Sequence, residues 1–160
     1  MSEEDLTGTV DVDLMLNGDV VGLSVRPDER LVDTLRFRLG LGSVRESCGI
    51  GVCGSCTVIV DDSLSVSGCL TLTAMMQGRS LRTAEGLGSD AETAALQEAF
   101  IDAKAFQCSF CTPGMILAAS LSSPEDEVEE TLAGNLCRCG AYPRIRNALQ
   151  MWFDGCAEKE

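Results

Sequence analysis

The sequence contains no histidine and few aromatic residues: five Phe, one Tyr and one Trp among 160 positions. The absence of imidazole excludes Ser-His-Asp and Cys-His catalysis, histidine-ligated haem and Rieske clusters, and zinc fingers that mix cysteine with histidine. We therefore expect no catalysis from this chain alone. The shortage of aromatic side chains implies an aliphatic core, and two small domains with such cores need another source of stability.

Long apolar runs and an excess of basic residues are also missing. No apolar segment approaches the ~20 residues that a membrane-spanning helix requires, and residues 1–11 lack the basic and apolar parts of a secretory signal. We expect a cytoplasmic protein with no membrane insertion. The 12 Lys and Arg residues against 25 Asp and Glu give a net charge of -13, which repels phosphate backbones and makes nucleic acid an unfavourable partner.

Cysteine, in contrast, is abundant, with nine residues in the chain. In a reducing cytoplasm, cysteines bind metals or carry redox chemistry more often than they form structural disulfides. The apolar fraction of 45% is sufficient for a packed interior. The spacing of the cysteines is therefore the most informative feature of a chain that is expected to fold.

The N-terminal part, residues 1–83, has the pattern of a small α+β domain. Alternating apolar residues predict two strands within residues 10–25, and Asn17-Gly18 favours a tight turn between them. Leucines at every fourth position predict a helix over residues 30–39. A loop rich in glycine and cysteine follows, and then an apolar strand at 57–60.

The C-terminal part, residues 84–160, has the pattern of four short helices and is expected to form an all-α four-helix bundle. Helix-start signals, each with a capping residue or an early proline, occur at four places. They are Ser89 with Glu92, Thr112-Pro113, Ser123-Pro124 and Pro143. The third helix is expected to run from an acidic first turn to Gly134. The last helix carries an apolar face made of Ile145, Ala148, Leu149 and Trp152.

The first four cysteines form a recognisable set. They are Cys48, Cys53, Cys56 and Cys69, separated by four, two and twelve residues. This order is typical of plant-type 2Fe-2S ferredoxins, and the glycines between the cysteines suit a loop that turns its backbone N-H groups toward bridging sulfides. A zinc site with four cysteines is the alternative that the spacing leaves open.

A second set consists of Cys108, Cys111, Cys137 and Cys139: a pair separated by two residues, then 25 residues, then a pair separated by one. Taken alone, this spacing fits zinc as well as a 2Fe-2S cluster. Helices are expected to begin just after Cys111 and just after Cys139, and helix N-termini stabilise negative charge. A 2Fe-2S centre with four thiolates is an anion, so this placement favours a cluster, and Arg138 between two ligands would act in the same direction.

Three segments together resemble one protein family. ESCGIGVCGSCTV (46–58), QCSFCTPGM (107–115) and GNLCRCGAYPRI (134–145) are similar to the iron-sulfur subunit of the molybdenum hydroxylases, the family of xanthine oxidase and dehydrogenase, aldehyde oxidoreductase and carbon monoxide dehydrogenase. The resemblance covers nearly the full length. It implies an α+β chain with an N-terminal ferredoxin-like β-grasp domain and a C-terminal four-helix domain, each holding one 2Fe-2S cluster.

The resemblance also implies partners. In this family the clusters carry electrons from a molybdopterin-bound molybdenum centre in a large subunit to FAD in a medium subunit, although some relatives use a cytochrome as acceptor. The second quartet would face the pterin, which Gln107 would contact through its amide, with Cys139 as the nearest ligand. The first quartet would lie nearer the flavin. The complex is expected to be a dimer of such heterotrimers.

Two functions of other classes stay compatible with the residues. One is a stand-alone ferredoxin with two clusters, which would dock through its acidic surface. The other is a zinc-binding interaction module. The substrate of an associated large subunit is open among N-heterocycles, aldehydes and carbon monoxide. The ninth cysteine, Cys156, matches no ligand position and is expected to act as a small apolar residue near the C-terminus.

Overall fold

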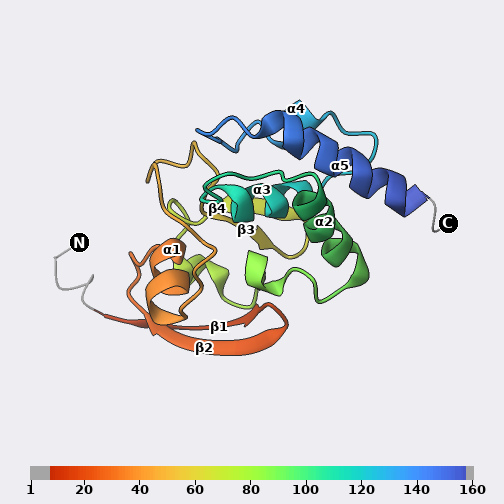
Figure 1. Ribbon diagram of the computed structural model, residues 1–160. Helices are drawn as coiled ribbons and strands as arrows, with labels where there is room; N and C mark the ends of the chain where they lie inside the picture. Colours follow the sequence, from red (N-terminus) through yellow and green to blue (C-terminus); the bar gives the residue numbers. More distant parts are fainter. Residues whose placement is uncertain (1–7, 158–160) are drawn as a thin grey trace.

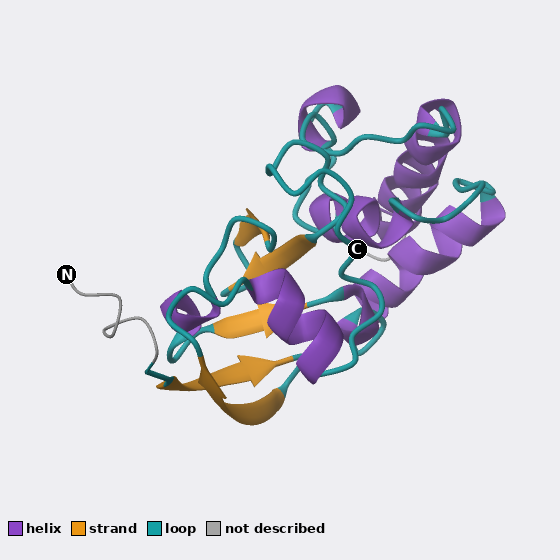
Figure 2. Cartoon of the chain, turned by 90° about the vertical axis from the view of Figure 1, so that its left-hand side faces the viewer, coloured by secondary structure: helices purple, strands orange, loops and turns teal. Residues whose placement is uncertain are grey.

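The computed structural model describes the backbone of residues 8–157 and the side chains of residues 8–155. The side chain of Cys156, expected to be a small apolar group, lies outside this described part. Most of the helices lie together at one end of the molecule, beyond the strands (Figure 2). Within residues 8–157, no helix combines the length and the hydrophobicity needed to cross a bilayer.

A mixed five-stranded sheet forms the N-terminal half, in the order β2-β1-β5-β3-β4 (Figure 1). Its strands are β1 (Val10–Leu16), β2 (Asp19–Val25), β3 (Thr57–Val60), β4 (Leu64–Ser67) and β5 (Ser80–Arg82). β1 runs parallel to β5, and the other neighbouring strands are antiparallel. The expected hairpin is confirmed, because Asn17 and Gly18 join β1 to β2 with φ of 53° and 95°, the left-handed values that a tight turn requires.

The helix expected over residues 30–39 is present, but its second half is wider than an α-helix. α1 (Leu31–Asp33) passes directly into a π-helical turn, η2 (Thr34–Arg38), in which the Leu39 N-H donates to the Thr34 carbonyl at 3.1 Å. The buried Thr34 hydroxyl lies 2.7 Å from that of Thr73, at the start of the 3-10 turn η3 (Thr73–Met76). The wide turn therefore accompanies a contact between distant parts of the chain, which a helix-period pattern does not reveal.

β3 is buried on both faces. Val58 and Val60 join the apolar core between the sheet and α1. Ile59 points to the opposite face and packs with Leu117 of α3 (Thr112–Ala119). A short run of consecutive apolar residues is the pattern of a strand with two buried faces. The helical half of the chain is thus attached to the sheet through α3.

The other helices are α2 (Ala91–Asp102), α4 (Val128–Thr131) and α5 (Tyr142–Ala157), and the 3-10 turn η4 (Ala84–Gly86) precedes them. α2 packs against α5 (Figure 1), and α3 packs against β3. α2, α3 and α5 enclose one apolar core, with Val128 of α4 at its edge. The apolar face expected in the last helix is confirmed, because Ile145, Ala148, Leu149 and Trp152 are all buried.

Two helix starts differ by one residue from the expected positions. We expected Ser89 to cap α2, but the N-cap is Asp90, whose carboxylate accepts from the Thr93 N-H at 2.8 Å. A carboxylate is a stronger acceptor than a hydroxyl. We expected Thr112 to cap α3, but Thr112 is already helical and Cys111 is the N-cap, since the Cys111 carbonyl accepts the first helical hydrogen bond.

The helix expected from Ser123-Pro124 to Gly134 is wrong in extent, because only the four residues of α4 are helical. The start signal does form a turn, in which the Asp126 carboxylate accepts from the Ser123 N-H at 2.7 Å. The chain then becomes extended at Glu127, with ψ of 127°. Residues 125–127 are all acidic and supply no apolar stripe, and most helices depend on packing such a stripe for their stability.

Candidate metal centres

The first quartet is built from the loop between η2 and β3 together with the turn after β4. Cys53, Cys56 and Cys69 are buried, and Cys48 is half-buried. The loop turns sharply at Gly51, where φ is 75° and an added Cβ would lie 2.4 Å from Leu70 Cδ1. The cysteine loop therefore passes beside the segment that carries Cys69, and the left-handed backbone at Gly51 favours glycine.

The four thiols of the first quartet lie in two pairs. Cys48 lies beside Cys53, and the backbone N-H of Ile50 together with the Cys53 thiol lowers the pKa of Cys48 to about 6. Cys56 lies beside Cys69, and burial raises the pKa of Cys56 to about 11. A backbone N-H that points at a sulfur favours the thiolate form, which is the form that binds a metal.

The second quartet comes from the segments that precede α3 and α5, and it is more open. Cys108 and Cys139 are exposed, whereas Cys111 and Cys137 are half-buried. Its thiols also lie in two pairs. The Phe110 N-H and the neighbouring Cys139 thiol lower the pKa of Cys108. Burial and the neighbouring Cys137 thiol raise the pKa of Cys111 to about 12.

Two pairs of thiols per quartet fit a centre with two irons. A 2Fe-2S cluster takes four thiolates, two on each iron, whereas a structural zinc ion takes four ligands around one point. The sulfur donors, their pairing and the N-H groups that face them therefore suit 2Fe-2S clusters.

A short segment, residues 134–137, joins the two quartets. The Leu136 N-H donates to the Cys53 carbonyl at 3.0 Å, and Leu136 is followed directly by Cys137. The buried Asn135 side chain donates to the Gly54 carbonyl at 3.2 Å. A ligand position of one quartet is thus connected to a ligand position of the other through backbone atoms and a single hydrogen bond.

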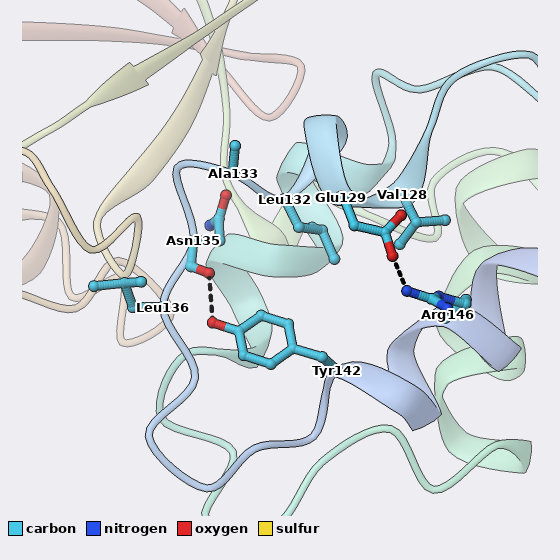
Figure 3. Close-up of a pocket in the computed structure, with 8 residues that line it drawn as sticks. All are labelled: Val128, Glu129, Leu132, Ala133, Asn135, Leu136, Tyr142 and Arg146. Atoms are coloured by element: carbon cyan, nitrogen blue, oxygen red, sulfur yellow. Dashed lines mark hydrogen bonds and ion pairs between the residues drawn. The ribbon is translucent and has the colours of Figure 1, made fainter.

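Tyr142, in the first turn of α5, holds this segment in place. Its hydroxyl donates to the Asn135 carbonyl at 3.1 Å and accepts from the Cys137 N-H at 2.8 Å. Figure 3 shows the ring at the side of a pocket of about 330 Å³, whose other wall carries the ion pair of Arg146 with Glu129. The pocket contains no cysteine of either quartet, so it meets the metal centres only through Tyr142 and the linking residues Asn135 and Leu136.

A second hollow, of about 520 Å³, lies between the two quartets and is lined by cysteines of both. The rest of its lining consists of the apolar residues Val52, Phe110 and Leu136 and of four residues with polar groups: Ser47, Ser55, Arg138 and Tyr142. Gln107 lies at the outer side of the second quartet, where it is exposed and donates its amide N-H to the Cys139 carbonyl at 3.1 Å. The structure thus brings Gln107 and Cys139 together.

Sequence reasoning missed Asn135 and Tyr142 as parts of the site. Both lie within the segment GNLCRCGAYPRI, so the segment itself was singled out. Their polar groups act on backbone atoms of other residues, however, and cysteine spacing contains no signal for such contacts.

Comparison with known proteins agrees with this geometry. Residues 14–79 match the family model of the 2Fe-2S iron-sulfur cluster binding domain, and residues 83–150 match that of a second 2Fe-2S binding domain. The small FeS subunit of nicotinate dehydrogenase from Eubacterium barkeri is 37% identical over 154 residues, which cover 92% of this chain and 98% of the relative. The small subunit of nicotine 6-hydroxylase from Paenarthrobacter nicotinovorans is 42% identical over 146 residues, 88% of this chain and 87% of the relative.

A solved structure extends the likeness to the whole fold. Quinoline 2-oxidoreductase from Pseudomonas putida 86 superposes with a TM-score of 0.84 at 35% identity, over 95% of this chain and 98% of the matched chain. The chain belongs to the family of iron-sulfur subunits of the molybdenum hydroxylases. As a member of that family it is a non-catalytic, electron-transferring subunit of an oxidoreductase and carries 2Fe-2S clusters. Its relatives are subunits of larger enzymes, so it works with partner chains.

Proposed function

We propose that the chain relays electrons between a molybdopterin-molybdenum centre in a large subunit and FAD in a medium subunit, within a cytoplasmic dimer of heterotrimers. When bound, the two clusters supply one-electron redox chemistry. The relatives named after nicotinate, nicotine and quinoline favour an N-heterocycle as the substrate of the whole enzyme. The chain's own residues hold the clusters, connect them and meet the partners.

We assign one cluster to each quartet of cysteines and one domain to each of the two large apolar cores. Cys48, Cys53, Cys56 and Cys69 hold one cluster in a ferredoxin-like domain, residues 1–83. Cys108, Cys111, Cys137 and Cys139 hold the other in a domain of residues 84–160, built as a four-helix bundle. The pairing of the thiols within each quartet supports this assignment.

The connection between the quartets is the observation that carries the relay. The hydrogen bond from the Leu136 N-H to the Cys53 carbonyl links ligand positions of the two quartets without any intervening side chain. A stand-alone binding module with two zinc ions would have no use for such a link, whereas a relay needs its two centres to be closely coupled. We place the second quartet toward the pterin, because its exposed cysteines, Cys108 and Cys139, face solvent.

Low-temperature EPR of the dithionite-reduced protein tests the proposal, with iron, sulfide and zinc measured on the same sample. We expect two distinct S = 1/2 signals with different relaxation behaviour. A silent spectrum with zinc in place of iron would contradict the relay and favour an interaction module. Two clusters in a chain that never copurifies with a large subunit would favour the stand-alone ferredoxin.

Ligand variants test how the quartets are divided. We expect Cys53→Ser and Cys111→Ser each to abolish one EPR signal, and a different one, because each removes a thiolate from a separate cluster. The measurement is the EPR spectrum of each variant beside its iron content. Loss of the same signal in both variants would mean that the eight cysteines are wrongly divided.

Gln107 is proposed to contact the pterin through its exposed amide. We expect Gln107→Ala to keep both EPR signals but to weaken association with the large subunit or slow electron delivery from it, because the amide can donate and accept hydrogen bonds without adding charge. The matched control is Gln150→Ala, since Gln150 is also an exposed amide and donates to Asp154 within α5. Wild-type association and turnover in Gln107→Ala would exclude this role.

A further inference from the structure

Arg45 belongs to the loop of the first quartet but reaches the loop of the second. Its backbone N-H donates to the Ser55 carbonyl at 3.0 Å, between Cys53 and Cys56. Its guanidinium donates to the carbonyls of Ser109 at 2.5 Å and of Phe110 at 3.1 Å. One half-buried arginine is therefore bound to the ligand loops of both quartets.

The two carbonyls that Arg45 binds lie between Cys108 and Cys111, in a strained part of the second loop. Ser109 has φ of 60°, a left-handed conformation that few residues other than glycine adopt readily. The Phe110 ring packs under the guanidinium, 5.5 Å from its central carbon, which adds a cation-π contact. Arg45 thus stabilises the turn that presents Cys108 and Cys111.

The same peptide group also faces the ligand sulfur. The carbonyl of Ser109 accepts from Arg45, and the N-H of that peptide bond, which belongs to Phe110, points toward Cys108. Hydrogen bonds in series polarise one another, so a cation on the carbonyl strengthens the N-H as a donor. The positive charge therefore acts on the second centre through an aligned peptide dipole.

The charge of Arg45 is not cancelled by a carboxylate. None of the ion pairs among residues 8–155 includes it, in a chain of net charge -13. Arg138 lies between two ligands but is exposed, so solvent screens its charge more strongly. A reduced 2Fe-2S cluster carries one more negative charge than an oxidised one, and a nearby uncompensated cation favours the reduced form.

We propose that Arg45 is a positioning residue through which the first domain holds the second cluster's loop and raises that cluster's reduction potential. This inference rests on the proposed 2Fe-2S cluster of the second quartet. The proposed function and this inference are contradicted by different results. Absence of a second iron-sulfur signal in the wild-type protein would overturn the proposed function. A second cluster whose reduction potential and iron content do not depend on Arg45 would overturn only this inference.

The test is an EPR-monitored redox titration of the full-length protein, with iron measured in each sample. In Arg45→Gln, poised at the wild-type midpoint of the second cluster, we expect the ratio of oxidised to reduced second cluster to rise about tenfold, or ~59 mV for one electron. The ratio of oxidised to reduced first cluster should change less. Arg45→Lys keeps the charge but not the planar guanidinium, whose Nη1 donates to both carbonyls while its Nε donates to the Gly42 carbonyl, so its ratio of oxidised to reduced second cluster should lie between those of wild type and Arg45→Gln.

Arg36→Gln is the matched control. Arg36 also donates to a backbone carbonyl, that of Val44, and also lies over a phenylalanine ring, that of Phe37, but it does not contact the second loop. Two results would overturn the inference. One is a rise in the ratio of oxidised to reduced second cluster in Arg36→Gln that is as large as in Arg45→Gln. The other is a wild-type ratio in Arg45→Gln with full iron content. If Arg45→Gln instead loses iron from the second cluster alone, and Arg45→Lys retains it, the positioning role is supported.

Discussion

At the scale of single residues, Gly54 lies where three backbone segments approach closely. A Cβ on Gly54 would lie 2.3 Å from Asn135 Nδ2 and 2.6 Å from the Gly134 carbonyl oxygen. Its own carbonyl oxygen lies 2.1 Å from the position that a Cβ on Gly114 of α3 would take. The backbones of the first loop, the 134–137 segment and α3 therefore meet at a point where no side chain fits.

We expect Gly54→Ala to lower the free energy of unfolding by about 3 kcal/mol, because the methyl group overpacks the contact and φ of 67° disfavours alanine. Gly18→Ala is the control: its φ is also positive, but a Cβ there would meet nothing within 4 Å, so only the conformational cost of about 1 kcal/mol applies. Denaturant unfolding of both variants measures the difference. Equal losses would show that the contact at Gly54 is not tight.

Much of the candidate site could be predicted residue by residue, but not all of it. The two sets of cysteines stand out because ligand spacing is a local property of the chain. Asn135 could not be assigned a role, because it acts on Gly54, which is 81 positions away. Arg45 likewise acts 64 positions away, on Ser109. Such contacts exist only once the two loops are folded against each other.

At the scale of secondary-structure elements, periodic patterns and short signals differ in what they predict. The face of α5 was predictable because four apolar residues recur with the helical period and are then buried. The extent of α4 was not predictable, because a segment that has a helix-start signal but no apolar stripe forms only a turn. The strands β4 and β5 have only four and three residues, too few for an alternation to stand out.

The N-terminus of α2 offers a test at this scale. Asp90 caps the helix, and the backbone N-H and hydroxyl of Thr93 lower the pKa of Asp90. We expect Asp90→Ala to destabilise the protein by about 1 kcal/mol at pH 7 and Ser89→Ala to have almost no effect, because the Ser89 hydroxyl does not bind the helix N-terminus. Urea unfolding of the two variants measures this difference.

The effect of Asp90 also has a defined pH dependence. Since its pKa is lowered in the folded protein, the stabilisation is complete above the unfolded value of about 3.9 and is lost as the pH falls through the folded value. A penalty for Asp90→Ala that declines already between pH 7 and pH 5 would contradict this assignment.

At the scale of the whole molecule, the sheet and the helices are joined through a small apolar cluster. Ile59 of β3, Leu87 and Leu117 of α3 pack together and are all buried. The cluster lies between the larger core under α1 and the core of the helices. The mixed fold could be anticipated from the two different periodicities. This junction could not, because Ile59 and Leu117 have the pattern of ordinary core positions in their own elements and Leu87 lies in a connecting segment.

We expect Leu117→Ala to cost about 2–5 kcal/mol and to split thermal unfolding into two steps, because it weakens the contact between the halves. Leu96→Ala is the control, since Leu96 is equally buried but lies wholly within the helical core. Leu96→Ala should lower the free energy of unfolding by a similar amount and leave thermal unfolding as a single step. Circular dichroism, followed together with the visible absorption of the clusters, measures both. A single step in Leu117→Ala would show that the halves are coupled mainly elsewhere.

The two quartets differ in how far the folded chain must open before a metal centre can be filled. Three of the four cysteines of the first quartet are buried in the folded chain, whereas two of the second are exposed. Iron and sulfide supplied after folding meet exposed thiols at the second quartet, whereas all four thiols of the first become accessible only through local opening of the chain. Filling the second centre in an already folded chain therefore needs less opening than filling the first.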